Sequence, residues 1–349
     1  MSEILAPCGA MESLTAAVNA GADAVYLGEE YFSARKNADN FTAEQLCDAV
    51  RFCHYSGVKV YVTLNTLVFD REIPLLAKAI ENCAKADVDA FIVQDMGVAR
   101  LARQIVPELP LHASTQMTVN SPEGAIMAKE LGFTRVVLGR ELSLAQIKAI
   151  TESCDIETEL FVHGALCVCI SGQCYMSSVL GGRSGNRGLC AQPCRLDFTS
   201  GDRHNVLSLK DLSLTEKLPE LAKAGIISFK IEGRMKRPEY VAGAVNACRV
   251  ALDGGTPDLI SLKNVFSRSG FTSGYFDDDF KNMQGVRTKD DVTSATSKVL
   301  SAMKQYYHKP FRRFPADITV NVKSGQPVSY KLSACGVSSV SYTHLTLPT

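Results

Sequence analysis

The sequence lacks the features of a membrane, secreted or strongly charged protein. No run approaches the roughly 18 apolar residues of a membrane helix, and the N-terminal MSEILAPCGAMES has neither a basic region nor an apolar stretch of secretory length. Lys and Arg number 37, as do Asp and Glu, so neither sign of charge is in excess. An RNA or DNA partner would therefore need a local basic patch. A hydrophobic fraction of 46% is ordinary for a soluble globular protein. Twelve cysteines in a chain without an export signal indicate a reducing compartment, so we expect a cytoplasmic protein that does not enter a membrane.

Several catalytic motifs are also missing. The chain contains no HExxH, GxSxG or P-loop sequence, so no familiar protease or nucleotide-hydrolase chemistry is visible. The GxGxxG fingerprint of dinucleotide-binding folds is absent too. Any catalytic chemistry must therefore come from other residues.

Short apolar segments alternate with amphipathic ones from Glu3 to about Gly255. The apolar segments predict eight strands, which are Ile4–Cys8, Ala24–Gly28, Lys59–Asn65, Ala90–Asp95, Leu111–Gln116, Arg135–Arg140, Glu159–His163 and Ser228–Glu232. Thr42 is a plausible N-cap of the first long amphipathic segment. Strict alternation of strands and helices indicates a parallel sheet, and eight strands over about 250 residues match an α/β fold of the (β/α)8 TIM-like barrel type. A doubly wound open sheet is the alternative.

The alternation stops after Gly255. Residues 1–255 form the predicted catalytic barrel, with a Cys-rich insertion at 164–200 after the seventh strand, and residues 256–313 form a predicted irregular surface segment. Alternating apolar and polar residues in Asp317–Ser333 predict a β-hairpin, the start of a truncated β-rich domain at 314–336. Residues 337–349 resemble translated cloning adapter and are predicted to be a non-native tail.

Cysteine is concentrated in one stretch. Five of the twelve cysteines lie in the Gly-rich segment from His163 to Arg195. Four of them have six, fifteen and three residues between them, namely Cys167, Cys174, Cys190 and Cys194. Thiols that glycines allow to converge indicate ligands of a soft metal or an iron–sulfur cluster, although free cysteines are more often buried hydrophobic residues. The spacing leaves zinc and iron–sulfur both open.

Polar residues follow the predicted strands at their C-terminal ends, where the active site of a barrel lies. Lys230, Glu232 and Arg234 alternate along the last strand, so they share one face and are candidate catalytic residues. His163 is a candidate proton donor. The alternatives are a structural ion-pair layer and a structural histidine. Candidate substrate-binding residues are Asn65, Gln94, Asp95, Gln116, Arg140 and Glu141 at strand ends, with Arg183 and Arg187 in the insertion.

Three segments together resemble peptidase family U32, also called the collagenase-like peptidases. They are ELFVHGALCVCISGQCYMSS, KIEGRMKRPEYVAG and LAPCGAMESLTAAVNAGADAVYLG. Better understood members of that family are oxygen-independent hydroxylases that carry a 4Fe–4S cluster on four cysteines. The motifs NTL, IVQDMG, LHASTQ and SGQCY look closest to the line that hydroxylates a cytidine of 23S ribosomal RNA. A second line acts on the wobble uridine of transfer RNA.

The resemblance implies a reaction, a ligand set and partners. It implies an iron–sulfur-dependent hydroxylase of an RNA base, with Cys167, Cys174, Cys190 and Cys194 as cluster ligands and prephenate as a candidate donor of the hydroxyl group. Because members of the ribosomal line are longer, the chain is expected to be truncated. A U32-type peptidase, with zinc or no metal on the cysteines, and an RNA-binding scaffold without turnover stay as alternatives. Four thiolates close a metal site, which argues against the peptidase.

Overall fold

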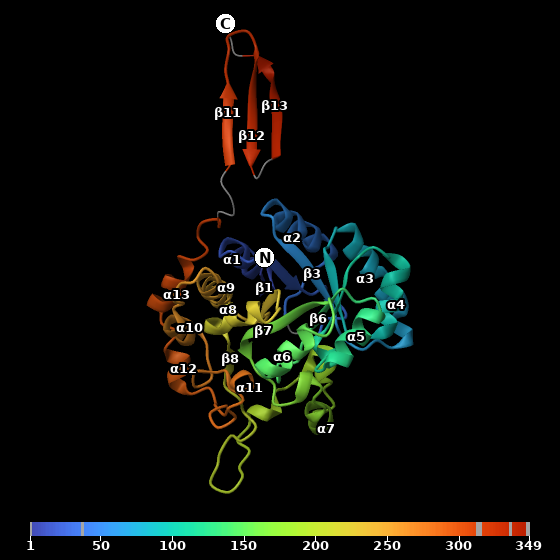
Figure 1. Ribbon diagram of the computed structural model, residues 1–349, viewed down its shortest axis with the longest axis vertical. Coiled ribbons are helices and arrows are strands. Elements are labelled where there is room, and N and C mark those ends of the chain that lie inside the picture. The colour runs from blue at the N-terminus through green and yellow to red at the C-terminus, as the bar shows by residue number, and fades with distance from the viewer. Residues whose placement is uncertain (1, 36–37, 312–315, 335–336, 347–349) are drawn as a thin grey trace. The chain divides into compact units, whose positions relative to one another are not determined.

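The computed structural model describes residues 2–35, 38–311, 316–334 and 337–346. The chain divides into two compact units, Met1–Lys309 and Pro310–Thr349. The first unit is a ring of strands surrounded by helices, and the second contains three strands (Figure 1). Among the described residues, none of the helices combines the length and the apolar character needed to cross a bilayer.

Eight parallel strands close into a barrel in the first unit. They are β1 (Glu3–Pro7), β2 (Ala24–Leu27), β3 (Lys59–Leu64), β4 (Ala90–Val93), β5 (Leu111–Ala113), β6 (Arg135–Val137), β7 (Glu157–Ala165) and β9 (Ser228–Ile231). Leu5 of β1 pairs with Ala24 on one side and with Lys230 of β9 on the other. Since β9 also pairs with β7, the ring is closed. The predicted barrel and its eight strands are confirmed, and the open-sheet alternative is wrong.

Helices connect the strands and cover the outside of the ring (Figure 1). They are α1 (Met11–Asn19), α2 (Ala43–Tyr55), α3 (Ile73–Lys85), α4 (Met96–Ile105), α5 (Pro122–Glu130), α6 (Leu144–Thr151), α8 (Leu218–Lys223) and α9 (Pro238–Leu252). The Thr42 hydroxyl accepts a hydrogen bond from the Gln45 N–H, and the Gln45 side chain accepts one from the Thr42 N–H. This capping box confirms the predicted start of α2.

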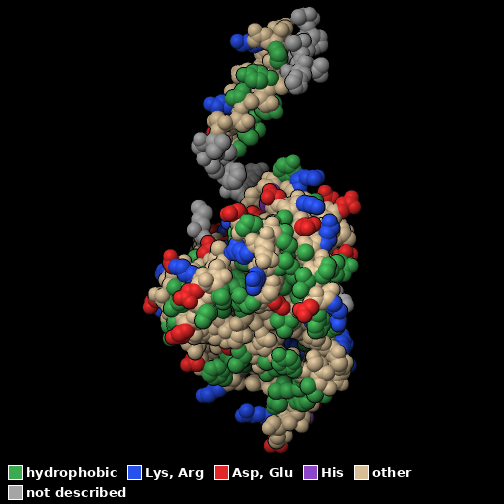
Figure 2. Space-filling model, turned by 90° about the vertical axis from the view of Figure 1, so that its right-hand side faces the viewer, with side chains coloured by type: hydrophobic (Ala, Val, Ile, Leu, Met, Phe, Trp, Pro, Cys, Tyr) green, Lys and Arg blue, Asp and Glu red, His purple; other side chains and the backbone are tan. Residues whose placement is uncertain are grey.

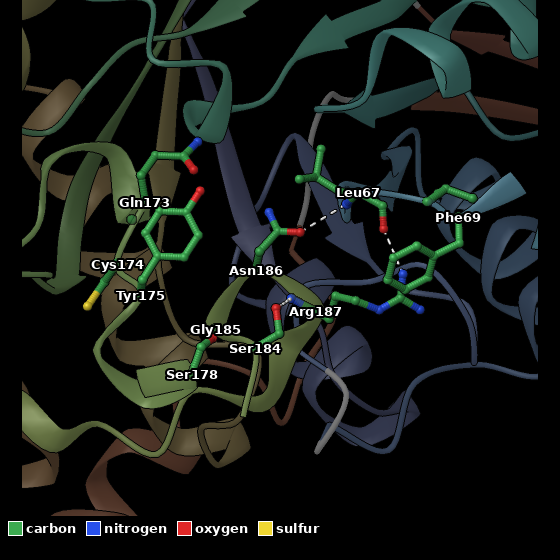
Figure 3. Close-up of a pocket in the computed structure, with 12 residues that line it drawn as sticks. Leu67, Phe69, Gln173, Cys174, Tyr175, Ser178, Ser184, Gly185, Asn186 and Arg187 are labelled. Carbon is green, nitrogen blue, oxygen red and sulfur yellow. Dashed lines mark hydrogen bonds between the residues drawn. The ribbon is translucent and has the colours of Figure 1, made fainter. Parts of the chain in front are cut away.

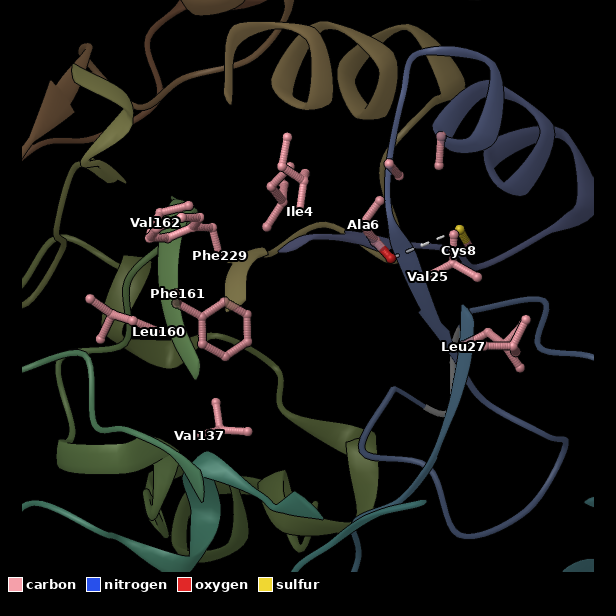
Figure 4. Close-up of a cluster of buried hydrophobic side chains, with 14 of the residues drawn as sticks. Ile4, Ala6, Cys8, Val25, Leu27, Val137, Leu160, Phe161, Val162 and Phe229 are labelled. Atoms are coloured by element: carbon pink, nitrogen blue, oxygen red, sulfur yellow. Dashed lines mark hydrogen bonds between the residues drawn. The ribbon is translucent and has the colours of Figure 1, made fainter. Parts of the chain in front are cut away.

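Alternate residues of each strand face the helices or the interior of the barrel. Ile4 belongs to the large cluster under the helices, whereas Leu5 and Tyr26 belong to a separate inner cluster. Figure 4 shows Ile4 directed toward the helices and Phe161 directed into the ring. Residues two apart on a regular strand therefore share a face, and those at the C-terminal ends reach one mouth.

The Cys-rich insertion leaves the barrel at the C-terminal end of β7. It contains α7 (Met176–Gly181) and short helical turns at Ile170–Gly172, Gly185–Leu189 and Pro193–Arg195. β8 (Asp211–Ser213) then pairs antiparallel with the end of β7, and β10 (Phe271–Thr272) pairs with β8. The insertion therefore lies at the face where the active sites of such barrels are found.

The segment after the barrel is more regular than predicted. Residues 256–313 contain α10 (Leu259–Val265), α11 (Gly274–Asp277), α12 (Lys289–Thr293) and α13 (Ser297–Lys304). Leu262 of α10 and Met303 of α13 are buried, and both helices pack on α9. The sequence pattern misses these helices because each is short and buries only one or two apolar side chains, which is too few to reveal a helical period.

The second unit is a three-stranded antiparallel sheet. β11 (Ala316–Asn321) and β12 (Pro327–Ala334) form the predicted hairpin, in which Asp317 pairs with Ser333. β13 (Val337–Thr346) adds a third strand beside β12. The origin of residues 337–349 as a non-native tail stays a prediction, and residues 347–349 lie outside the described part of the chain. The finer domain boundaries stay predictions.

Candidate functional site at the barrel mouth

A layer of buried ion pairs fills the barrel below its mouth. Arg135 Nη1 lies 2.6 Å from Glu3 Oε1 and 3.2 Å from Glu159 Oε2, and Lys230 Nζ lies 2.7 Å from Glu159 Oε1. Lys230 also stands 4.5 Å above the Tyr26 ring. Burial lowers the pKa of Lys230, and Glu159 partly offsets this effect. The structure thus places Lys230 in the ion-pair layer, and its catalytic role stays a prediction.

Glu232 and Arg234 follow Lys230 in the sequence and lie beyond the ion-pair layer, at the mouth of the barrel. Glu232 Oε1 accepts a hydrogen bond of 2.8 Å from Arg35 Nη2. Arg234 Nη1 donates to the hydroxyls of Ser33 (2.5 Å) and Thr63 (3.0 Å). Sequence reasoning missed Arg35, because it follows β2 in a loop with no regular pattern.

Arginines outnumber carboxylates around Glu232. Burial alone would raise the pKa of Glu232, but the charges of Arg35, Arg140 and Arg234 outweigh it and lower that pKa to about 2. Neither Arg140 nor Arg234 has a carboxylate within ion-pair distance among the described side chains, and Arg140 Nε is buried without a hydrogen-bond partner there. Three positive charges against one negative charge leave an excess of two. An excess of this kind, on one buried and two partly exposed guanidinium groups, is stabilised by a bound anion.

The four predicted ligands lie in the insertion beside this mouth. Cys167, Cys174, Cys190 and Cys194 are free thiols that are at least partly exposed. A Cβ on Gly185 would lie 3.4 Å from the Cys174 carbonyl oxygen and 3.7 Å from Cys190 Cβ, so the backbone brings these two cysteines close together. Burial raises the pKa of the Cys194 thiol, Arg195 lowers it, and the charges of the other three cysteines raise it. The N–H of Met176 donates to Cys174 Sγ (3.4 Å) and that of Gln192 to Cys190 Sγ (3.3 Å).

The donor chemistry of this quartet fits a group held by thiolates. Four cysteines and N–H donors to sulfur are typical of iron–sulfur sites, and four cysteines also suit zinc. Within the described part of the chain, however, no three Cys, His, Asp or Glu side chains stand close enough to hold one metal ion. A single zinc ion needs every sulfur about 2.3 Å away, whereas a cluster binds them through separate iron atoms.

Asn186, which sequence reasoning missed, fastens the insertion to the rim of the barrel. Its Nδ2 donates to the side-chain oxygens of Gln94 (2.6 Å) and Gln116 (3.1 Å), and its Oδ1 accepts from the Leu67 N–H (3.0 Å). The structure thus brings the predicted Gln94 and Gln116 together. No motif in the sequence marks Asn186, because its partners lie in distant loops.

The two arginines predicted to bind substrate from the insertion make hydrogen bonds within the protein. Arg187 makes a two-pronged ion pair with Glu72 (2.6 and 3.0 Å) and donates to the Leu67 carbonyl (2.7 Å). Arg183 Nε donates to the Leu189 carbonyl (3.1 Å) and remains exposed. Of these two, only Arg183 has a charge that no carboxylate balances among the described residues.

The remaining predicted binding residues have local hydrogen bonds. Asp95 caps α4 by accepting from the Gly97 and Val98 N–H groups. Asn65 Oδ1 accepts from the Ala34 N–H (3.0 Å). Glu141 Oε1 accepts from the Ser171 N–H (2.9 Å), while its other oxygen is buried without a partner among the described atoms. Their roles in substrate binding stay predictions.

The structure separates His163 from the mouth. Phe161 pairs with Lys230, but His163 pairs with the next residue, Ile231, because β7 contains a bulge between them. The bulge turns His163 outward, where its ring lies 5.0 Å from Phe271. Burial lowers its pKa to about 4, and neither ring nitrogen has a hydrogen-bond partner among the described residues. The His163 carbonyl accepts a hydrogen bond from the Glu232 N–H (2.8 Å), but its ring packs against Phe271. Its role as a proton donor stays a prediction.

A pocket of about 180 Å³ opens between the insertion and the loop after β3. Its lining residues are Leu67, Val68, Phe69, Gly172, Gln173, Cys174, Tyr175, Ser178, Ser184, Gly185, Asn186 and Arg187. In Figure 3, Tyr175 and Phe69 stand on opposite sides, with Asn186 between them. In the face seen in Figure 2, Lys and Arg are interspersed with Asp and Glu, so no charge of one sign dominates it.

Comparison with known proteins identifies the family. The family model described as Peptidase family U32 matches residues 9–284. The 23S rRNA 5-hydroxycytidine C2501 synthase of Escherichia coli is 43% identical over 284 residues, which cover 78% of this chain and 42% of that protein. tRNA hydroxylation protein P1 of Bacillus subtilis is 38% identical over 270 residues, covering 73% of this chain and 64% of its own length.

A third relative has a different kind of name. The protein of Porphyromonas gingivalis named Collagenase is 36% identical over 306 residues, which cover 78% of this chain and 73% of that protein. The chain thus spans less than two thirds of the E. coli and B. subtilis relatives. The match over most of its length shows that the chain belongs to peptidase family U32.

Proposed function

We propose that the chain is the barrel part of an enzyme that hydroxylates a base in RNA, with a ribosomal RNA cytidine as the first candidate and a transfer RNA wobble uridine as the second. The observation that carries this proposal is a set of four free thiols, with Cys174 close to Cys190, in the insertion beside a mouth rich in arginine. Relatives named for ribosomal and transfer RNA hydroxylation support the substrate class.

The proposed cofactor is a 4Fe–4S cluster held by Cys167, Cys174, Cys190 and Cys194. Such a cluster supplies one-electron chemistry, whose potential depends on hydrogen bonds to its sulfurs and on exposure. The N–H groups of Met176 and Gln192 provide such hydrogen bonds. Zinc is the alternative, since four cysteines also form closed tetrahedral zinc sites.

The mouth is proposed to hold a small anionic donor of the hydroxyl group, for which prephenate is a candidate. Arg35, Arg140 and Arg234 together exceed Glu232 by two charges, so a carboxylate-bearing molecule would compensate them. Guanidinium groups bind carboxylates through paired hydrogen bonds, which would orient such a donor.

A peptidase is the second candidate because one relative is named Collagenase. Hydrolysis of a peptide needs an activated nucleophile or a metal with an open position. His163 activates no cysteine, since its ring nitrogens have no partner among the described residues. An RNA-binding scaffold without turnover would not explain the four cysteines, because RNA binding alone needs no thiol ligands.

The test begins with iron content and visible absorption of the chain purified without oxygen, for the wild type, Cys174→Ser and Cys169→Ser. We expect about four irons per chain, which should be lost in Cys174→Ser. They should be kept in Cys169→Ser, because Cys169 is the fifth cysteine of the same insertion and is not one of the four predicted ligands. Nucleoside analysis of ribosomal and transfer RNA then identifies the modified base. A colourless protein with stoichiometric zinc would reject the redox mechanism.

A further inference from the structure

We infer that the pocket beside Cys174 receives one unstacked pyrimidine base of a single-stranded RNA segment, with Tyr175 as its stacking surface. This inference rests on the proposed RNA substrate and names the site where the target base would bind. A base inside a duplex cannot reach a barrel mouth, so a flipped or unpaired base is needed.

The size of the pocket suits a single six-membered ring. Its volume is about 180 Å³, and apolar cavities of about 150 Å³ bind benzene. A pyrimidine ring therefore fits. The walls are mainly apolar or aromatic, from Leu67, Val68, Phe69 and Tyr175, as expected for a site that replaces base stacking.

Tyr175 is the free aromatic surface at this pocket. Its side chain is 71% exposed, and its ring packs against no other ring or cation among the described residues. The Phe69 ring is less available, since the guanidinium groups of Arg71 and Arg187 lie 4.7 and 5.1 Å from its centroid. A large exposed aromatic side chain at a pocket is typical of a binding surface.

The charges around the pocket suit RNA. None of the lining residues is acidic, and the Arg187 charge is balanced by Glu72. Arg71, which lies over the Phe69 ring, and Arg183, which precedes Ser184, are exposed, so both cations are accessible to phosphates of a bound RNA. An uncharged protein segment would gain nothing from these two cations.

The pocket is attached to the barrel and includes one of the proposed cluster ligands. Asn186 ties it to Gln94 and Gln116 on the barrel, which reduces the entropy lost when a ligand binds. Cys174 is both a lining residue and a member of the cysteine quartet. A base stacked on Tyr175 would therefore stand beside the redox centre, as the proposed reaction requires.

The test measures binding and needs no turnover. Fluorescence anisotropy compares two short single-stranded RNAs that differ only at one central position, cytidine in one and abasic in the other. We expect Tyr175→Ala to weaken binding of the cytidine RNA by about tenfold and to leave binding of the abasic RNA unchanged. Tyr175→Trp should keep the affinity, and Tyr55→Ala is the control, because Tyr55 is 87% exposed at the end of α2, away from the pocket.

Three results would overturn the inference. They are equal binding of both RNAs by the wild type, an equal effect of Tyr175→Ala on both, and no effect on either, as expected if a protein segment covers the pocket. If Tyr175-dependent binding occurs but no hydroxylated nucleoside forms, the inference stands and the hydroxylase proposal fails. Hydroxylation that persists at wild-type level in Tyr175→Ala rejects the inference alone.

Discussion

At the scale of single residues, two charged side chains on the same face of a strand can have different roles, depending on the charges around them. Lys230 and Glu232 share a face of β9, yet Lys230 is balanced by Glu159 while Glu232 is outnumbered by arginines. Only around Glu232 does positive charge exceed negative charge, so an anionic ligand is expected there and not at Lys230. His163, two residues beyond Phe161, belongs to neither level because it points outward.

Stability should depend on pH through His163. Its folded pKa of about 4 lies below the ordinary 6.5, so between these values the unfolded chain binds more protons and stability falls as pH falls. From pH 7 to pH 5 this amounts to about 2 kcal/mol. His163→Phe should remove that part of the loss in urea unfolding at the two pH values, because phenylalanine can pack against Phe271 without titrating.

The control and the contrary result for His163 are both measurable. The exposed His308 serves as control, and His308→Gln should leave the pH dependence unchanged. If His163→Phe kept the pH dependence and abolished hydroxylated nucleosides, the result would support the proton-donor hypothesis and contradict the titration argument.

At the scale of elements, the insertion is held at the mouth by side chains and not by a sheet. Within the described structure, its segments from Ile170 to Arg195 are short helical turns and α7, with no strand. Asn186 and Arg187 fasten one of these turns to β3, β4 and β5 through the loops that follow them. The positions of Cys174 and Cys190 on either side depend on that attachment.

Breaking the ion pair of Arg187 should loosen the insertion. Arg187→Met removes two hydrogen bonds to the half-exposed Glu72 and one to the Leu67 carbonyl, which we expect to cost about 1 kcal/mol. Limited proteolysis within the insertion should then be about five times faster. Arg183→Met, which loses one bond to a carbonyl, should cleave at the wild-type rate; equal acceleration in both variants would contradict this attachment.

At the scale of the whole molecule, closure of the barrel depends on a network that crosses it. Arg135 of β6 reaches Glu3 of β1 and Glu159 of β7, and the Ser228 hydroxyl of β9 donates to Glu3. The network thus joins strands that are distant in the sequence and lie on both sides of the closing β1–β9 pair.

Arg135→Met should destabilise the whole barrel. It would leave Glu3 without its cation and Glu159 with Lys230 alone, and removing one partner of a buried ion pair costs about 3–5 kcal/mol. Urea unfolding at pH 7 measures the loss. The exposed Arg100 on α4 provides the control, since Arg100→Met should change stability by less than about 0.5 kcal/mol. Comparable stability of the two variants would show that the network does not hold the ring closed.

The sequence by itself determined the architecture and the identity of the thiol ligands to be tested. The period of two in segments such as Lys59–Asn65 and the helical period of Ile73–Lys85 are local properties, so they can be read without neighbours. The close spacing of Cys190 and Cys194 is local as well.

Tertiary structure decided which side chains meet. The partners Arg35 and Glu232 are 197 positions apart, and Asn186 joins two strands that no local pattern links to it. The outward turn of His163 follows from how β7 pairs with β8 and β9, since a bulge shifts every later residue to the other face. Such contacts depend on chain closure over long distances, which residue periodicity does not encode.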